Sequence, residues 1–243
     1  MSGVRAAGYA DRSDNARQLY FVHDAALAVE DRRVIIAVDG PAASGKGTIA
    51  RALGRHFGLP HLDTGKLYRA VGLAVLLAGR DPADAEAATA AATSFDPALL
   101  DDAGLMSAAN AQAASIVSAH PTVRAVLLDR QRAFAAQPGG AVLDGRDIGT
   151  VIVPDADAKL FVTAAPPVRS ARRAAELAAA GLAADPDTVL ADILARDTRD
   201  SGRTTAPLRQ ATDAALLDTS EMAIAAAVAH AIALVTARVG ARG

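Results

Sequence analysis

Short apolar segments alternate with longer helix-like stretches along most of the chain. The first of them, residues 34–38, is a continuous apolar run that ends at Asp39 and Gly40. A run of this kind is typical of a strand that is buried on both faces of a parallel sheet. Four later segments have a similar character, and each leads into a polar cluster: residues 59–62, 141–143, 159–162 and 214–217.

Helical patterns fill the intervals between these segments. They are predicted over residues 48–57, 67–77, 123–136, 168–180 and 222–235. Strands that alternate with helices form βαβ units, so we expect an α/β fold whose parallel sheet is covered by helices on both faces. Ligands of such folds bind at the carboxyl ends of the strands, which is where the polar clusters of this sequence lie.

Two regions depart from this alternation. Residues 80–124 are rich in alanine and predict helices and loops without a strand, so we interpret them as part of a lobe inserted into a connection of the sheet. Residues 1–33 have no clear period apart from one short helical pattern over residues 21–29. We expect them to form a flexible N-terminal extension ahead of the folded domain.

Composition narrows the class of protein. The chain has 243 residues, and 51% of them are apolar, which excludes a wholly disordered protein. The 25 basic and 27 acidic residues give a net charge of −2, so there is no broad basic surface for nucleic acid. Cysteine is absent from the sequence, which excludes disulfides and cysteine nucleophiles. No apolar segment reaches the roughly 20 residues of a membrane span, and we expect a cytoplasmic protein without membrane contact.

A phosphate-binding loop follows the first predicted strand. Its pattern is a glycine, four residues, and then Gly-Lys, at the start of a predicted helix. Glycines let backbone N–H groups turn inward around an anion, and the helix N-terminus adds partial positive charge. The lysine neutralises the β- and γ-phosphates. The predicted nucleotide-binding residues are Gly40, Pro41, Ala42, Ala43, Ser44, Gly45, Lys46, Gly47 and Thr48.

The loop indicates a nucleoside triphosphate but does not identify a reaction. A GTPase needs an Asn-Lys-x-Asp segment, and neither Asn15 nor Asn110 is followed by lysine. A motor ATPase usually has Asp-Glu after its magnesium strand, whereas this chain has Asp144-Gly145-Arg146-Asp147. Gly47 also stands where serine or threonine usually holds magnesium, and Thr48 follows one residue later.

Three clusters of acids and arginines are suited to holding a second phosphorylated molecule. They read D-T-G-x-x-Y-R at residues 63–69, D-G-R-D-x-G-T at 144–150 and R-D-x-R-D-x-x-R at 196–203. Together with the loop, and with P-L at 207–208, D-A at 213–214 and L-D-T-S at 217–220, they make the chain resemble the bacterial cytidylate kinases from about residue 34 to 235.

The resemblance implies a phosphate-loop kinase of the adenylate-kinase-like type. Its domain would span residues 34–240 around a five-stranded parallel sheet, with an inserted monophosphate-binding lobe at about 66–136 and a short lid at about 172–200. The implied reaction transfers the γ-phosphoryl of ATP to CMP or dCMP with Mg²⁺, in a monomeric enzyme. ATP and CMP repel each other, so arginines and a divalent cation are needed to bring them together.

Matched positions also imply roles for residues of the acceptor site. Arg69, Arg124 and Arg146 would hold the phosphate of the monophosphate. Thr64 and Asp147 would contact its sugar.

The last motif and the magnesium site complete the assignment. Arg196 would lie near the pyrimidine and the sugar, and Asp200 and Arg203 would help to close the site. Thr48 and Asp144 would hold Mg²⁺, partly through water. The residues expected to carry the reaction are Lys46, Asp144, Arg146 and Arg203.

Arg172 and Arg173 are predicted to begin a helix at the border of the lid. There Arg172 would add positive charge beside ATP, although the two arginines could equally form a solvated helix face.

Two other functions stay open at this stage. The first is a related kinase with UMP or another small phosphoryl acceptor. The second is a nucleotide-binding module without turnover, although such a module needs no second cluster beside its loop. Near residues 105–108 the chain also lacks the arginine and glutamate that relatives often carry.

Overall fold

The computed structural model describes residues 33–179, 181–183 and 185–241. The chain divides into two units, Met1–Glu30 and Asp31–Gly243. The first unit lies outside the described residues, and so does the short helix predicted over residues 21–29. The expected extension over residues 1–33 is therefore described only at Arg33, and the fold below is that of the second unit.

Five strands form one sheet in which every neighbouring pair is parallel. They are β1 (Val34–Asp39), β2 (His61–Asp63), β3 (Gly140–Gly145), β4 (Ala158–Thr163) and β5 (Ala215–Asp218), in the spatial order β2-β3-β1-β4-β5. The prediction of a five-stranded parallel sheet is thus confirmed, with strand ends shifted by one or two residues. Asp63 pairs with Asp144, and Asp39 pairs with Gly145, so the polar residues after three strands meet at one edge.

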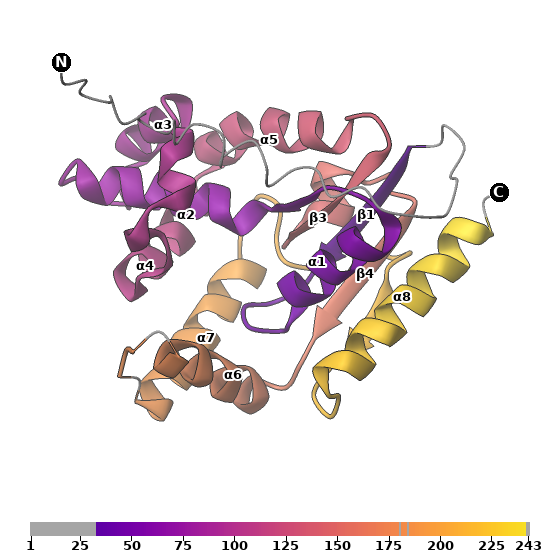
Figure 1. The fold of residues 1–243 in the computed structure, drawn as a ribbon. Helices are drawn as coiled ribbons and strands as arrows, with labels where there is room; N and C mark the ends of the chain where they lie inside the picture. Colours follow the sequence, from indigo (N-terminus) through magenta and orange to yellow (C-terminus); the bar gives the residue numbers. More distant parts are fainter. Residues whose placement is uncertain (1–32, 180, 184, 242–243) are drawn as a thin grey trace, which may run out of the picture. The chain divides into compact units, whose positions relative to one another are not determined.

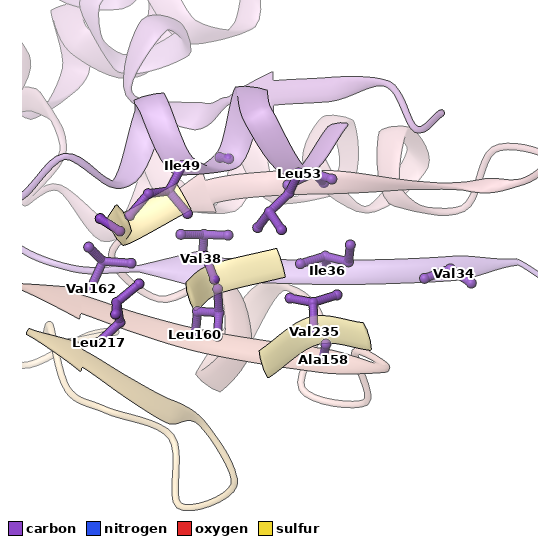
Figure 2. Packing of buried hydrophobic residues seen from close by; sticks show 14 residues of the cluster. Val34, Ile36, Val38, Ile49, Leu53, Ala158, Leu160, Val162, Leu217 and Val235 are labelled. Carbon is purple, nitrogen blue, oxygen red and sulfur yellow. The ribbon is translucent and has the colours of Figure 1, made fainter. Parts of the chain in front are cut away.

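Helices cover both faces of the sheet (Figure 1). The side chains of β1 alternate between the faces because a strand has a period of two residues. Val34, Ile36 and Val38 pack against α1 (Lys46–Phe57) and α8 (Ile224–Gly240), and Figure 2 shows Ile49 and Leu53 of α1 above them. The opposite face packs against α5 (Pro121–Ala135) and a π-helical turn, η5 (Ile148–Ile152).

The insert between β2 and β3 has a small hydrophobic core of its own. It comprises α2 (Thr64–Leu77), α3 (Ala85–Thr93), α4 (Ala108–Val117), two 3₁₀ turns at Pro97–Asp101 and Ala103–Met106, and α5. Val71, Val75, Val117 and Leu127 are fully or almost fully buried in this core. Residues 80–124 contain no strand, as predicted. Gly72 lets α4 approach α2 closely, because a Cβ there would lie 2.8 Å from the amide nitrogen of Ala114.

A pair of packed helices follows β4: α6 (Pro166–Ala179) and α7 (Pro186–Ser201). In Figure 1 this pair lies at the lower left, below α2 and α4. The expectation that Arg172 and Arg173 begin a helix is wrong. The helix begins at Pro166, since proline lacks only an N–H that the first helical turn leaves unpaired, and both arginines lie in its second turn.

The helix α7 was absent from the predicted helices, although it carries the third motif. Only Val189, Ile193 and Asp200 of this helix are buried, so its sequence has a weak apolar stripe. Asp185 caps its N-terminus by accepting a hydrogen bond from the amide of Thr188 at 2.8 Å. Its N-cap, Asp185 followed by Pro186, is thus a clearer sequence signal of this helix than its apolar periodicity.

Candidate active site

The loop after β1 has the conformation of an anion-binding turn. Gly40 lies so close to β4 that an added Cβ would be 2.0 Å from the carbonyl oxygen of Val162. Gly45 has φ of +89° and caps the N-terminus of α1, which begins at Lys46. The helix therefore points its first N–H groups and its partial positive charge toward the loop. Ala43 has φ of +57°, a left-handed conformation that is costly for alanine.

A cleft of about 510 Å³ opens beside this loop. Its walls come from the loop, from α2 and α4 of the insert, from the segment after β3, and from α6 and α7. Nine basic and six acidic side chains line it, so it carries excess positive charge. The predicted residues that line it are Ala42, Ala43, Gly45, Lys46, Gly47, Thr48, Thr64, Arg69, Arg124, Asp144, Arg146, Asp147, Arg196, Asp200 and Arg203.

The predicted residues that do not line the cleft are Gly40, Pro41, Ser44 and Arg172. Arg172 instead donates hydrogen bonds to the backbone carbonyl oxygens of Ser44 at 3.3 Å and Thr219 at 2.7 Å. Its guanidinium thereby ties α6 to the loop and to the residue that follows β5. The structure thus gives Arg172 a contact with the backbone of the loop.

Asp200 joins two of the predicted arginines. Its carboxylate accepts from Nε of Arg146 at 2.7 Å, and its other oxygen accepts from Nη2 of Arg203. The Asp200 side chain is 1% exposed. Burial disfavours the charged carboxylate, but the guanidiniums of Arg146 and Arg203 hold the pKa of Asp200 below its ordinary value. The third motif is thereby connected to the second through a buried ion pair.

A second buried ion pair lies alongside. Arg124 of α5 donates to the Asp147 carboxylate and, at 3.3 Å, to the backbone carbonyl of Ser118. The Arg124 guanidinium also stacks over the Tyr68 ring, 5.6 Å from its centroid. Arg124 and Asp147 are 7% and 6% exposed at their side chains, so neither charge is well hydrated.

Three of the predicted cations that line the cleft, Lys46, Arg69 and Arg196, have no ion pair among the described residues. Arg69 donates to the backbone carbonyl of Leu105 at 3.2 Å, and the buried Nε of Arg196 has no hydrogen-bond partner. Burial and the nearby Arg146 lower the pKa of Arg196 to about 9. The same two causes lower the pKa of Lys46 to about 8. A bound anion would relieve the repulsion between these cations and Arg146 and would compensate for the water that they lose on burial. The geometry therefore favours a phosphorylated ligand.

Asp144, near the end of β3, has a carboxylate oxygen that could bind a cation. Its Oδ1 bonds Nε2 of His61 at 2.7 Å, while its Oδ2 lies 3.7 Å from where a Cβ would stand on Gly47. The described residues contain no group of three or more histidine or acidic side chains that could hold a metal alone. One carboxylate and the exposed hydroxyl of Thr48 fit Mg²⁺, which keeps several waters and takes its other ligands from phosphate oxygens.

Asp39 is a functional candidate that the sequence reasoning missed. Both of its carboxylate oxygens accept backbone N–H groups, from Ile148 and from Gly149, each at 2.8 Å. This holds the turn that directly follows Arg146 and Asp147. Burial raises the pKa of Asp39 to about 7, against the opposing effect of the two N–H donors. Its position just before the loop, at the end of a buried strand, was the signal available in the sequence.

Other side chains that were not predicted contact the phosphate loop or the acidic and arginine-rich motifs. His61 bonds Asp144, Ser115 bonds Arg199, Ser118 bonds Arg203, and Arg169 bonds the loop carbonyl of Ala42. None of them belongs to a recognisable local motif. They are identified only because the fold brings α4, α6 and α7 together around the cleft.

The fold and the site together define a phosphate-loop kinase: a parallel sheet with an anion-binding loop after its first central strand and an arginine-rich cleft beside it. The sequence profile described as cytidylate kinase matches residues 36–237. The chain therefore belongs to the cytidylate kinase family, and the resemblance noted in its sequence is confirmed.

Individual relatives support the same assignment. The cytidylate kinase of Rhodopseudomonas palustris (strain HaA2) is 57% identical over 204 residues, which cover 84% of this chain and 96% of the relative. That of Xanthobacter autotrophicus (strain ATCC BAA-1158 / Py2) is 60% identical over 205 residues, covering 84% and 98%. A crystal structure of an uncharacterized protein from Eubacterium ventriosum ATCC 27560 has a TM-score of 0.51 at 14% identity, covering 85% of this chain and all of that one. At this identity it supports the fold alone.

Proposed function

We propose that the protein transfers the γ-phosphoryl group of ATP to CMP or dCMP, giving ADP and CDP or dCDP. The observation that carries the proposal is the buried cluster of Arg146, Asp200 and Arg203, which lines the same cleft as the phosphate loop. Membership of the cytidylate kinase family supplies the acceptor, and ATP is the donor that this family implies.

On the donor side, the N–H groups of the loop and of the first turn of α1 would surround the β-phosphate of ATP. Lys46 would neutralise charge on the β- and γ-phosphates as the bond to the leaving oxygen breaks. Arg172 would act by holding the loop carbonyl of Ser44, a contact 3.3 Å long, and so keep the neighbouring amides pointed inward.

On the acceptor side, Arg69, Arg124 and Arg146 would bind the phosphate of the monophosphate. The contacts of Arg69 support this role, because its guanidinium donates to the backbone carbonyl of Leu105 and is in no ion pair among the described residues. A carboxylate already orients Arg146, which reduces the entropy lost when the phosphate binds. Little covalent chemistry is required of the protein, because orientation and charge neutralisation carry phosphoryl transfer.

The remaining acceptor contacts follow from their place in the cleft. Thr64 and Asp147 would contact the sugar, and Arg196 would lie near the pyrimidine and sugar. Thr64 is the first residue of α2, and its hydroxyl donates to the backbone carbonyl of Asp144 at 2.8 Å, which leaves its lone pairs free for a sugar hydroxyl. Asp200 and Arg203 would hold α7 closed over the acceptor.

Thr48 and Asp144 would hold Mg²⁺ together with water and phosphate oxygens. The bound ion would neutralise charge shared between the β- and γ-phosphates. His61 holds Oδ1 of Asp144 at 2.7 Å, and this leaves Oδ2 for the ion or for one of its waters.

The division into lobes is part of the proposal. We assign the monophosphate-binding lobe to about residues 66–136 and the lid to about 172–200, where closure would exclude water and suppress ATP hydrolysis. We expect a variant that begins at Asp31 to keep its activity. We also expect a monomer that acts in the cytoplasm, where its nucleotide substrates are found. Among the described residues no helix is long and apolar enough to cross a membrane.

The test is ADP release with ATP and Mg²⁺ in the presence of CMP, dCMP, UMP, AMP or GMP. The proposal predicts that CMP and dCMP are phosphorylated far faster than the other three. Preference for UMP would indicate the related kinase that the sequence left open. Binding of ATP without transfer to any monophosphate would indicate a binding module and would refute the proposed reaction.

A further inference from the structure

Arg169 connects three parts of the protein that surround the cleft. It lies on α6 and is 3% exposed. Its Nε donates to the carbonyl of Ala164, after β4, at 2.8 Å. Its Nη1 donates to the carbonyl of Ala42 in the phosphate loop at 3.2 Å. Both terminal nitrogens bond the carboxylate of Asp197 on α7, with one distance of 3.0 Å. All three nitrogens of the guanidinium are therefore used.

Asp197 occupies a particular place on α7. It directly follows Arg196, and it lies three residues before Asp200, which holds Arg146. Residues three apart lie on neighbouring positions of one helix face. A helix transmits a displacement at one residue to its neighbours because its backbone hydrogen bonds make it rigid over a turn. A displacement of the Asp197 carboxylate would therefore shift Arg196 and Asp200 relative to the cleft.

We propose that Arg169 is a positioning residue that couples the donor site to the acceptor site. The inference rests on the proposed function, because it requires that one nucleotide binds at the loop and another beside α7. A triphosphate that orders the loop fixes the carbonyl of Ala42. The Arg169 guanidinium is then fixed as well. Its bidentate contact fixes the Asp197 carboxylate, and with it Arg196 and Asp200, which face the acceptor site.

The geometry suits coupling better than stability alone. A bidentate arginine–carboxylate contact restricts both the distance and the angle between the two groups, so it transmits orientation. The ion pair itself contributes little net stability compared with apolar side chains of similar size, since the Arg169 guanidinium loses its hydration at a side chain that is 3% exposed. The second link between α6 and the loop, from Arg172 to the Ser44 carbonyl, keeps α6 and the loop together, so that α7 is the part that Arg169 aligns.

The test measures binding of CMP by calorimetry with and without the Mg²⁺ complex of AMP-PNP, a non-hydrolysable ATP analogue. Coupled sites typically change each other's affinity about 5- to 150-fold. We expect the analogue to lower the Kd of CMP at least about fivefold in the wild-type protein. In the Asp197→Asn variant this factor should fall below about two, while the Kd of each ligand alone changes by less than about threefold.

Three further variants separate coupling from folding. Asp197→Glu keeps the charge at a partly exposed position and should restore most of the coupling. Arg169→Lys keeps the positive charge but cannot make the bidentate contact with Asp197, so it should lose the coupling. The matched control is Asp187→Asn, which removes the same charge from an exposed residue of the same helix and should bind like the wild type. Thermal unfolding of each variant reports the loss of structure separately.

The outcomes distinguish this inference from the proposed function. If the wild-type sites bind independently, or if Asp197→Asn keeps the full coupling factor, Arg169 does not couple the sites. The proposed reaction would survive both results, because it is measured by CMP phosphorylation. Failure of the wild-type protein to phosphorylate CMP would refute the reaction whatever the binding data show.

Discussion

Nε of Arg146 donates to the carboxylate of Asp200 at 2.7 Å, although 54 positions separate the two residues along the chain. Arg146 follows β3 and Asp200 lies on α7, so the hydrogen bond links the segment after β3 to the helix pair formed by α6 and α7. A charged bond of this kind orients the guanidinium before any ligand arrives, and an oriented cation stabilises developing phosphate charge without reorganisation.

Replacement of Arg146 by alanine should therefore lower kcat/KM for CMP by about 10²- to 10³-fold, the usual effect of removing one preorganised donor to a developing charge. Steady-state kinetics with CMP varied at saturating ATP would measure it. Arg80→Ala is the control, because the Arg80 side chain is 59% exposed and its ion pair with Asp84 lies on the surface. Equal kinetics for the two variants would contradict the role of Arg146.

Replacement of Asp200 by alanine should destabilise the protein by roughly 3–5 kcal/mol, because it leaves buried cations without their shared partner. The side chain is 1% exposed, so water cannot replace the lost carboxylate without rearrangement. Urea unfolding would measure the change. Addition of CMP should recover part of the loss, since its phosphate supplies negative charge to Arg146 and Arg203. A variant as stable as the wild type would show that the ion pairs are exposed in solution.

The depressed pKa of Lys46 predicts how activity depends on pH. The charged lysine binds phosphate, and burial lowers its pKa to about 8, so kcat/KM for ATP should fall as the pH rises through about 8. A pH profile between 6 and about 10 would test it, and kcat should hold to higher pH because bound phosphate raises the lysine pKa. In Lys46→Arg the fall near pH 8 should disappear, and its persistence would assign the titration to another group.

Unfolding does not explain that fall. The folded-state pKa of about 8 lies below the ordinary value of 10.5, so the unfolded chain binds more protons between these two pH values. The free energy of unfolding contributed by Lys46 therefore rises with pH across that window. Thermal unfolding at each pH would separate the two effects.

Ala43 offers a prediction about stability. Its φ of +57° costs alanine roughly 1–2 kcal/mol relative to the right-handed region, and glycine adopts it freely. Ala43→Gly should raise the free energy of unfolding by up to about 1 kcal/mol, after allowance for the greater entropy of glycine in the unfolded chain. Urea unfolding measures it. Ala42→Gly is the matched control, since Ala42 is not among the described residues with positive φ, and it should lose stability. A loss at Ala43 as well would indicate that its methyl group packs in the loop.

Much of the fold followed from local patterns. Short apolar segments, each followed by a polar cluster, predicted the five strands of the sheet. In β1 and β3 the apolar run is continuous because a strand buried on both faces leaves little room for polar side chains. The loop at residues 40–48 was evident from its spacing. The helix α7 was missed because its polar composition hides the period, and the start of α6 was misplaced because Pro166 and Pro167 were not recognised as a helix start.

The sequence alone determined the class of the fold, the phosphate loop and the residue types that make up the three motifs, since all of these depend on neighbours in the chain. Only the tertiary structure decided which charges meet. It paired Arg146 with Asp200 and Arg124 with Asp147, placed Asp39 under the turn after Asp147, and joined Arg169 to Asp197. These contacts link residues far apart in the chain, so no local spacing encodes them. A charge that is removed from water is costly unless it is paired, so each of these side chains is stabilised by the oppositely charged partner that the fold places next to it.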